Sequence, residues 1–159
     1  MNDEAELYLQ RAENELVTAQ ILFDISSSSI LQKEQFKLEK DFTFYSAVIS
    51  HSYYCIFYSA KAILIKDGVR TEAPEVHKKT IAIFEERLVE TGKLDVELLK
   101  IYKKMIVRAE ELLGIFSREK GKRGEFTYQK LPQANREPAK KSLDNALFFF
   151  KNINKIIRK

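Results

Sequence analysis

Residues 42–66 read FTFYSAVISHSYYCIFYSAKAILIK, and this stretch decides the fold of the chain. It predicts one long helix with apolar and aromatic side chains almost all round it, and Gly68 is a natural residue to end that helix. A helix without a polar face has to be covered by neighbours on several sides, so we expect it at the centre of a bundle. Small residues along it allow other helices or a second subunit to approach closely: Ser46, Ala47, Ser50, Ser52, Ser59, Ala60 and Ala62.

Four further stretches place apolar residues three and four positions apart, which is the spacing of one helix face: about 4–23, 74–90, 95–118 and 135–159. Residues 26–40 lack this spacing and predict a loop or a frayed helical extension. Five Gly and three Pro supply too few turns for an all-β sandwich. The fold predicted is therefore all-α, an antiparallel up-and-down bundle of about five helices, with 74–90 as a shorter addition.

The length of 159 residues fits one domain over 1–159, and a hydrophobic fraction of 45% can bury a core. The acidic, amphipathic N-terminus and the lack of a long apolar run predict a cytoplasmic protein. Cys55 is the one cysteine, which excludes an internal disulfide, and its apolar surroundings predict an inert buried thiol. Because the chain has one cysteine and two histidines, we expect no metal site. We expect no other cofactor either.

The basic residues are concentrated in one part of the sequence. Residues 100–141 contain twelve basic and five acidic side chains, a net charge of +7, whereas the whole chain has a net charge of +4. Such a segment suits an anionic partner, either phosphate or an acidic protein. A solvated helical face rich in lysine explains the charge equally well.

The longest break in helical periodicity lies inside this basic segment. Residues 118–130 contain five cations together with a phenylalanine and a tyrosine, and glycines lie on both sides of Arg123. Arginine presents a planar fork that matches phosphate, and an aromatic ring nearby can stack on a base. Two interpretations stay open, a phosphate-binding loop and a solvated connection. The residues concerned are Arg118, Lys122, Arg123 and Tyr128.

Both histidines and the tyrosines of 42–66 favour structural roles. His51 lies among aromatic residues and is expected to be a hydrogen-bonded core residue. His77 is expected to cap its helix or to pair with Glu72 or Glu75. Three tyrosines are expected to be mostly core, with stacking on nucleic-acid bases as the alternative: Tyr53, Tyr54 and Tyr58.

Three segments in order resemble proteins with a HEPN domain: SAVISHSYYCIFYSAKAILIKDGV at 46–69, VHKKTIAIFEERLVETGKLD at 76–95 and ANREPAKKSLDNALFFFKNI at 134–153. The resemblance covers about residues 5–157 and is greatest to small prokaryotic members that are paired with a minimal nucleotidyltransferase. It implies a single helical domain and a two-fold homodimer in which the sites of both subunits face a shared cleft.

The family's hallmark is an arginine followed four to six residues later by a histidine, a pair that cleaves RNA without metal in active members. Here Arg123 is followed five residues later by Tyr128, so tyrosine stands where histidine is expected. The resemblance implies catalytic roles for Arg123 and Tyr128. From the charge of the loop itself, Arg118 and Lys122 are expected to make outer phosphate contacts beside Arg123. Arg108 is a second candidate for the family arginine, but the distance of Arg123 from the last helix fits the family better.

The tyrosine changes the expected chemistry. Histidine, with a pKa of about 6.5, accepts a proton at neutral pH, whereas tyrosine, with a pKa of about 10, mostly does not. Three functions follow: a metal-independent endoribonuclease toxin of a toxin–antitoxin pair, a module that binds RNA or nucleotides without catalysis, and a partner subunit of a nucleotidyltransferase with Tyr128 as the target of nucleotide transfer. A purely structural interaction protein remains the fourth alternative.

Overall fold

The computed structural model describes residues 3–114 and 135–159, and every regular element in those ranges is helical. The prediction of an all-α fold is confirmed. A π-helical turn, η1 (Glu85–Val89), continues α4 directly. The six α-helices of the described ranges are α1 (Asp3–Ser26), α2 (Ser29–Glu34), α3 (Tyr45–Lys66), α4 (Val76–Phe84), α5 (Val96–Leu113) and α8 (Arg136–Ile157).

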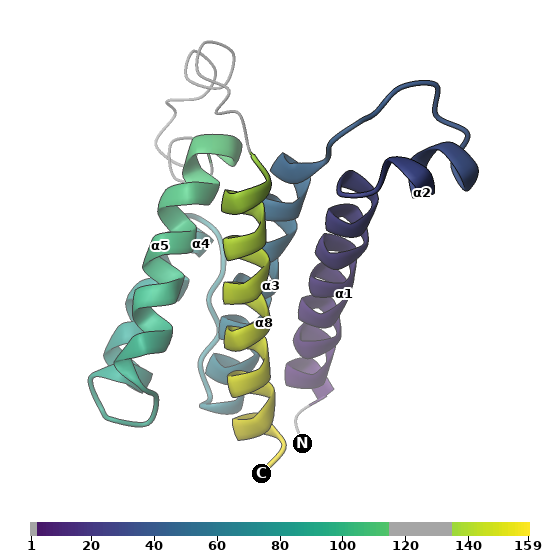
Figure 1. Cartoon of the computed structure of the whole chain (residues 1–159). Helices are drawn as coiled ribbons and strands as arrows, with labels where there is room; N and C mark the ends of the chain where they lie inside the picture. Colours follow the sequence, from purple (N-terminus) through teal and green to yellow (C-terminus); the bar gives the residue numbers. More distant parts are fainter. Residues whose placement is uncertain (1–2, 115–134) are drawn as a thin grey trace.

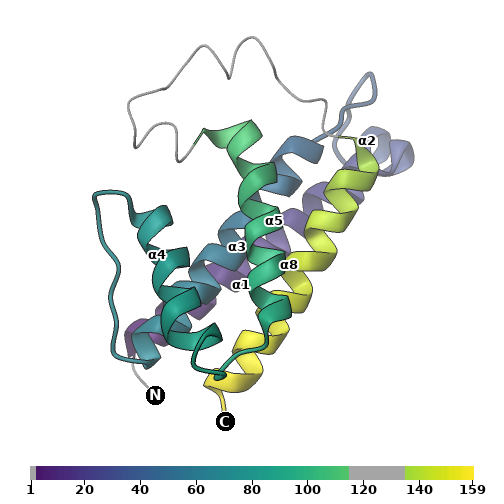
Figure 2. The same cartoon turned by 90° about the vertical axis from the view of Figure 1, so that its left-hand side faces the viewer.

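The long helices α1, α3, α5 and α8 alternate in direction along the chain (Figures 1 and 2). The chain after α3 first returns along the bundle, so α4 runs in the same direction as α3 (Figure 2). This short helix and η1 form the predicted smaller addition. Because α3 and α8 also share a direction, their C-terminal ends lie together, where Lys66 Nζ donates to the Ile157 carbonyl.

Helix α3 is the central element, as its sequence predicts. It packs against α1, α4, α5 and α8, and only Ser46 and Lys66 of its residues are exposed. The helices of one chain therefore cover α3. Of the two alternatives that the small residues of α3 left open, neighbouring helices or a second subunit, the structure shows the first, and the apolar surface of α3 does not by itself require a second copy of the chain. The homodimer itself stays a prediction that rests on the family resemblance.

Small residues bring α1 and α3 together. Ala5, Ala12 and Ala19 recur every seventh residue on α1 and have no exposed surface, and Ser26 continues the series. A seven-residue repeat keeps one seam of a helix against its neighbour over several turns. The buried Ala60 of α3 belongs to the same core cluster as Ala12. Small side chains on both helices allow the close packing that covers α3.

The residues between α1 and α3 differ from the sequence prediction. Helix α1 extends to Ser26, and the expected loop contains α2, which Ser28 caps through its side chain. The buried Gln32 amide holds this segment, because it donates to the Ile25 and Phe42 carbonyls and accepts from the Phe42 N–H. Helix α2 has only six residues, and bonds between residues ten positions apart hold it in place. Neither feature gives a repeat of apolar residues, so the sequence pattern did not predict this helix.

Two other predictions about the helices need correction. Helix α5 ends at Leu113, before the predicted end near Arg118, because Gly114 adopts a left-handed conformation with φ of 59°. Spacing along the last helix predicts a buried stripe without Phe149, although Phe149 is fully buried. The residues of the predicted stripe are Ala139, Leu143, Ala146, Phe150, Ile153 and Ile157. The ring of Phe149 packs against Phe84 and Tyr102, with ring centroids 5.7 and 5.8 Å away, and so joins α8 to α4 and α5.

Cys55 is buried, and desolvation raises the pKa of its thiol well above the ordinary value. The prediction of a buried thiol is confirmed, and its inertness stays a prediction that the raised pKa supports, because a neutral thiol is a poor nucleophile. In the part of the chain that the structure describes, no helix combines the length and hydropathy needed to cross a membrane.

Two fully buried tyrosines provide a matched test of this core. The Tyr53 hydroxyl lies 2.7 Å from His77 Nδ1, whereas the Tyr102 hydroxyl has no hydrogen-bond partner among the described residues. We expect Tyr53→Phe to lower the free energy of unfolding by about 1–2 kcal/mol, because it removes a buried hydrogen bond. Tyr102→Phe should leave it unchanged or raise it by about 1 kcal/mol, because an unpaired hydroxyl is costly to bury. Urea unfolding followed by circular dichroism measures both, and a larger loss for Tyr102→Phe would contradict the expectation.

Candidate functional site

The residues on which the sequence analysis placed the site lie outside the described residues. Arg118, Lys122, Arg123 and Tyr128 all belong to 115–134, so their roles stay predictions. The ends of that segment are described. Helix α5 ends just before it and α8 begins just after it, and the flanking turns of these two helices lie at the same end of the bundle (Figure 1).

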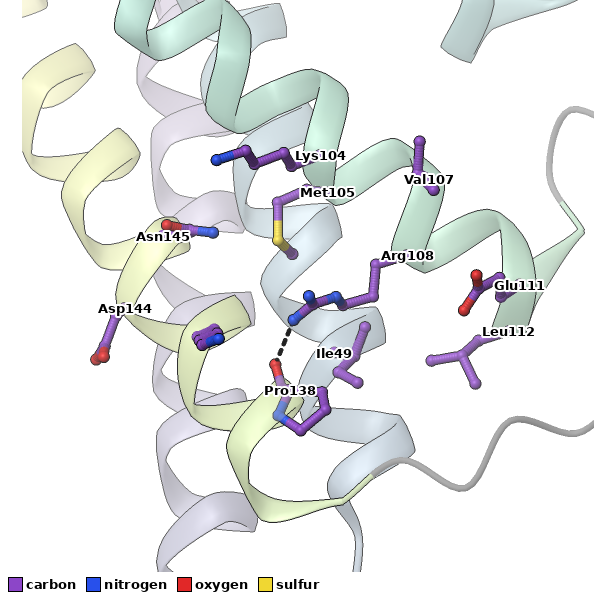
Figure 3. Close-up of a pocket in the computed structure, with 11 residues that line it drawn as sticks. Ile49, Lys104, Met105, Val107, Arg108, Glu111, Leu112, Pro138, Asp144 and Asn145 are labelled. Atoms are coloured by element: carbon purple, nitrogen blue, oxygen red, sulfur yellow. Dashed lines mark hydrogen bonds between the residues drawn. The ribbon is translucent and has the colours of Figure 1, made fainter.

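A cleft of about 950 Å³ lies between α5 and α8 at this end, with one wall from each helix and its floor on α3 (Figure 3). Its volume is at the upper end of the range of about 300–1,000 Å³ that is typical of small-molecule sites. Apolar side chains from α5 and α3 alternate with charged groups. The lining residues are Ile49, Lys104, Met105, Val107, Arg108, Glu111, Leu112, Pro138, Lys141, Asp144 and Asn145.

Arg108 is the best-anchored cation of the cleft. Its Nη1 donates to the Pro138 carbonyl oxygen at 2.8 Å and to the Ser142 hydroxyl at 3.3 Å. Its side chain therefore crosses from α5 to the first turn of α8 (Figure 3). The guanidinium has five N–H donors, and Nε and Nη2 have no partner among the described residues. Arg108 is half-buried, so these donors remain accessible from the cleft.

The charges around Arg108 favour an anion. Lys104 lies one helical turn before it on α5, and Lys141 lines the cleft from α8. Among the described residues, no carboxylate forms an ion pair with any of these three cations. Asp144 is already paired with Lys140 at 2.9 Å, and its carboxylate points away from α5 in Figure 3. Glu111, at the outer turn, is the remaining acidic group of the lining.

Helical spacing explains why these side chains meet. Lys104, Arg108 and Glu111 are separated by four and three residues, so they share one side of α5. Lys141 and Asn145 are likewise four residues apart on α8. The sequence analysis named Arg108 only as the second candidate and missed Lys104, Lys141 and Asn145. The four-residue spacing was the available signal, but it shows a shared face and not the facing helix.

Both histidines are hydrogen-bonded to side chains of other helices, but their surroundings differ from those predicted. His51 Nδ1 bonds to a Glu15 carboxylate oxygen, and about a third of its side chain is exposed, so it is not a core residue as expected. His77 does not cap its helix or pair with Glu72 or Glu75. It is 9% exposed, it bonds to the Tyr53 hydroxyl, and its ring packs on Phe57 with centroids 4.2 Å apart.

The tyrosines of α3 form part of an aromatic cluster between α1 and α3. Tyr53 is fully buried and therefore has no ring face for a base. Tyr58 stacks on Tyr8 with ring centroids 6.0 Å apart, and the guanidinium of Arg11 lies 5.9 Å from the Tyr58 centroid. Tyr54 packs against Tyr58. These contacts favour the structural interpretation over base stacking.

Within 3–114 and 135–159, no three His, Cys, Asp or Glu side chains gather as a metal site would require.

A family model for the HEPN domain matches residues 27–156, which include α2 to α5 and nearly all of α8. The chain belongs to the HEPN family. The matched part of this HEPN protein contains every residue that lines the cleft, whereas α1 precedes it. A comparison with curated proteins finds no match to the chain.

The buried His77 of this HEPN protein predicts a pH-dependent stability. Burial lowers the pKa of His77 to about 4, with a further decrease from the Lys61 charge and an opposing effect of Glu110. The unfolded chain takes up this proton below a pH of about 6.5, whereas the folded protein takes it up only near pH 4. The contribution of the neutral His77 to the free energy of unfolding is therefore fully present above pH 6.5, and it decreases as the pH falls from 6.5 towards 4.

We expect His77 to account for a loss of about 1–3 kcal/mol between pH 7 and pH 4.5. His77→Gln, which keeps an acceptor for Tyr53, should show a smaller loss than the wild type over this interval. Urea unfolding at both pH values gives the comparison, and equal pH dependence in the wild type and His77→Gln would contradict the assignment.

Proposed function

We propose that this HEPN protein binds the phosphate of RNA or of a nucleotide in the α5–α8 cleft, with Arg108 as the principal contact. One observation is decisive for this proposal. The Nη1 group of Arg108 is held by Pro138 and Ser142, while Nε and Nη2 have no partner among the described residues. These two groups form the edge of a guanidinium that binds two oxygens of one phosphate.

Charge supports an anionic ligand. Arg108, Lys104 and Lys141 line one partly enclosed cleft, and none of them forms an ion pair with a carboxylate of the described residues, so three cations stand against the two acidic groups Glu111 and Asp144. Bringing like charges together costs free energy that a bound anion would recover. The net charge of +7 over residues 100–141 adds a long-range field of the same sign.

The remaining lining suits the other parts of a nucleotide. Val107 and Leu112 are not fully buried and offer an apolar surface to a base, and the Asn145 amide faces α5 from the opposite wall (Figure 3). A ligand that is anionic at one end and flat and partly apolar at the other fits this combination better than an isolated inorganic anion does.

Arg123 and Tyr128 remain part of the proposal. They belong to the segment that joins the two walls, since Leu112 and Pro138 line the cleft close to its two ends. We propose that Arg123 binds phosphate with help from Arg118 and Lys122, and that Tyr128 acts beside it in metal-independent RNA cleavage, as in a toxin of a toxin–antitoxin pair. Tyrosine is a weak base at neutral pH, and loss of a good general base costs about 10²–10⁴ in rate.

The alternative is a binding protein without catalysis, which acts as the partner of a minimal nucleotidyltransferase. The same weak base favours it, because such a partner needs phosphate binding but not cleavage. Incubation of the purified protein with total RNA and tRNA in the presence of a chelator separates the two functions. Cleavage that disappears in Tyr128→Phe supports the nuclease, whereas binding without cleavage supports the partner subunit.

Arg108→Ala should weaken binding of a single-stranded RNA oligonucleotide by about 10–100-fold, because hydrogen bonds to a charged group contribute about 1.5–3 kcal/mol. Lys151→Ala, an exposed lysine of α8 outside the cleft, is the matched control and should bind like the wild type at equal salt. Fluorescence anisotropy at low salt measures both, and circular dichroism confirms the fold. Equal affinities for Arg108→Ala and the wild type would refute the cleft as the site.

The predicted role of the connecting segment has its own test. Arg123→Ala should weaken RNA binding by about 10–100-fold, whereas Lys130→Ala should have a smaller effect. Affinity should also fall steeply with salt if several phosphates are bound. If Arg123→Ala and Lys130→Ala bind alike, the residues of 118–130 act only as a general basic surface.

We also propose the two-fold homodimer that the HEPN resemblance implies. It would place two clefts in one molecule. Sedimentation equilibrium at micromolar concentration should give twice the chain mass of 18.6 kDa. A single species of 18.6 kDa would exclude the dimer and leave the cleft of one chain as the complete site.

A further inference from the structure

We propose that Ser142 is a positioning residue that holds the guanidinium of Arg108 with its Nε–Nη2 edge towards the cleft. This inference rests on the proposed function, because it specifies how the same cleft takes its ligand. The ligand is a phosphate monoester or diester with two oxygens that accept from that one edge. Ser142 acts through Arg108 and does not itself contact the ligand.

The hydrogen bonds around Ser142 leave its hydroxyl little freedom. The hydroxyl donates to the Pro138 carbonyl oxygen at 2.9 Å, so its lone pairs are available to accept from Arg108 Nη1 at 3.3 Å. Arg108 Nη1 also donates to the same Pro138 carbonyl at 2.8 Å. The three groups close a triangle, and Ser142 has no exposed surface that water could reach.

This triangle determines which edge of Arg108 remains available. In a guanidinium, Nη1 lies on the same side as Cδ, and Nε and Nη2 share the opposite edge. Two acceptors on Nη1 fix both the position and the plane of the group, whereas the Pro138 carbonyl alone would let the plane turn about a single bond. Fixing the plane reduces the entropy lost when the edge binds two oxygens at once.

Ser142 is favourable for a test because replacing it with alanine should alter the orientation of Arg108 without destabilising α8. Alanine has a higher helix propensity than serine, and the Ser142 hydroxyl bonds within its own helix to the residue four positions earlier. Ser142→Ala should therefore leave the stability of α8 nearly unchanged while it frees the Arg108 plane. A merely structural serine would show neither a change at Arg108 nor a change in ligand binding.

Ser59→Ala is the matched control. Ser59 is also fully buried in a helix, and its hydroxyl donates to the Cys55 carbonyl four residues earlier at 2.7 Å, with no arginine on it in the described contacts. Ser142→Thr keeps the hydroxyl and should restore the wild-type behaviour. Thermal unfolding of all three variants reports whether each one folds.

The first measurement observes Arg108 without any ligand. In ¹⁵N-labelled full-length protein, the Arg108 Nε–Hε signal, assigned by its loss in Arg108→Lys, should show restricted rotation of the guanidinium. Ser142→Ala should make the group rotate faster, because only the Pro138 carbonyl then holds Nη1, whereas Ser59→Ala and Ser142→Thr should leave the rotation rate unchanged. An unchanged rotation rate in Ser142→Ala would overturn the positioning role, whatever the ligand proves to be.

The second measurement is binding of a single-stranded RNA oligonucleotide and of inorganic phosphate. Ser142→Ala should weaken both by about 3–10-fold, the effect expected from one hydrogen bond. In an Arg108→Lys background it should have no further effect, because it acts only through Arg108. An equal loss in both backgrounds overturns the inference. If the wild type binds neither probe, the proposed function fails, and the NMR measurement still decides whether Ser142 orients Arg108.

Discussion

The need to bury α3 on all sides is the constraint on which the rest of the structure depends. Its apolar and aromatic residues leave only Ser46 and Lys66 exposed, so the other helices have to surround it. The seven-residue alanine repeat of α1 permits the closest of these contacts, and α8 covers another side in parallel orientation. The short α4 and its π-helical turn complete the cover where the long helices leave a gap.

The cleft is a consequence of this arrangement. Helices α5 and α8 each pack on α3, and near the end where the connecting segment leaves and returns both apolar and polar side chains join them. Leu112 of α5 packs in one cluster with Ala139 and Leu143 of α8, and Arg108 adds hydrogen bonds to Pro138 and Ser142. A guanidinium used in this way supports the fold with one side, and its other side remains available to an oxyanion. Under the proposed function, structural support and ligand binding share this residue.

Membership of the HEPN family and the geometry of the cleft both support the proposed function. The family match identifies the domain, and the proposal places the anion beside Lys104, Arg108 and Lys141, which form no ion pair with a carboxylate of the described residues. Catalysis depends on a further condition, a group that accepts a proton at neutral pH. If Tyr128 takes the place of the family's histidine, as the resemblance implies, that condition is met poorly at neutral pH, whereas binding of phosphate does not depend on it.

The sequence by itself determined the helical fold, the central place of α3, the buried Cys55 and the basic character of the part that contains the cleft. Each follows from periodicity or composition, which report how much of a helix is buried and where charge is concentrated. Only the tertiary structure decided that His77 bonds to Tyr53, that Gln32 holds α2, and that Arg108 meets Ser142. Such pairs join residues that are ten or more positions apart, and helical periodicity shows which face is buried but not which side chain of another element lies against it.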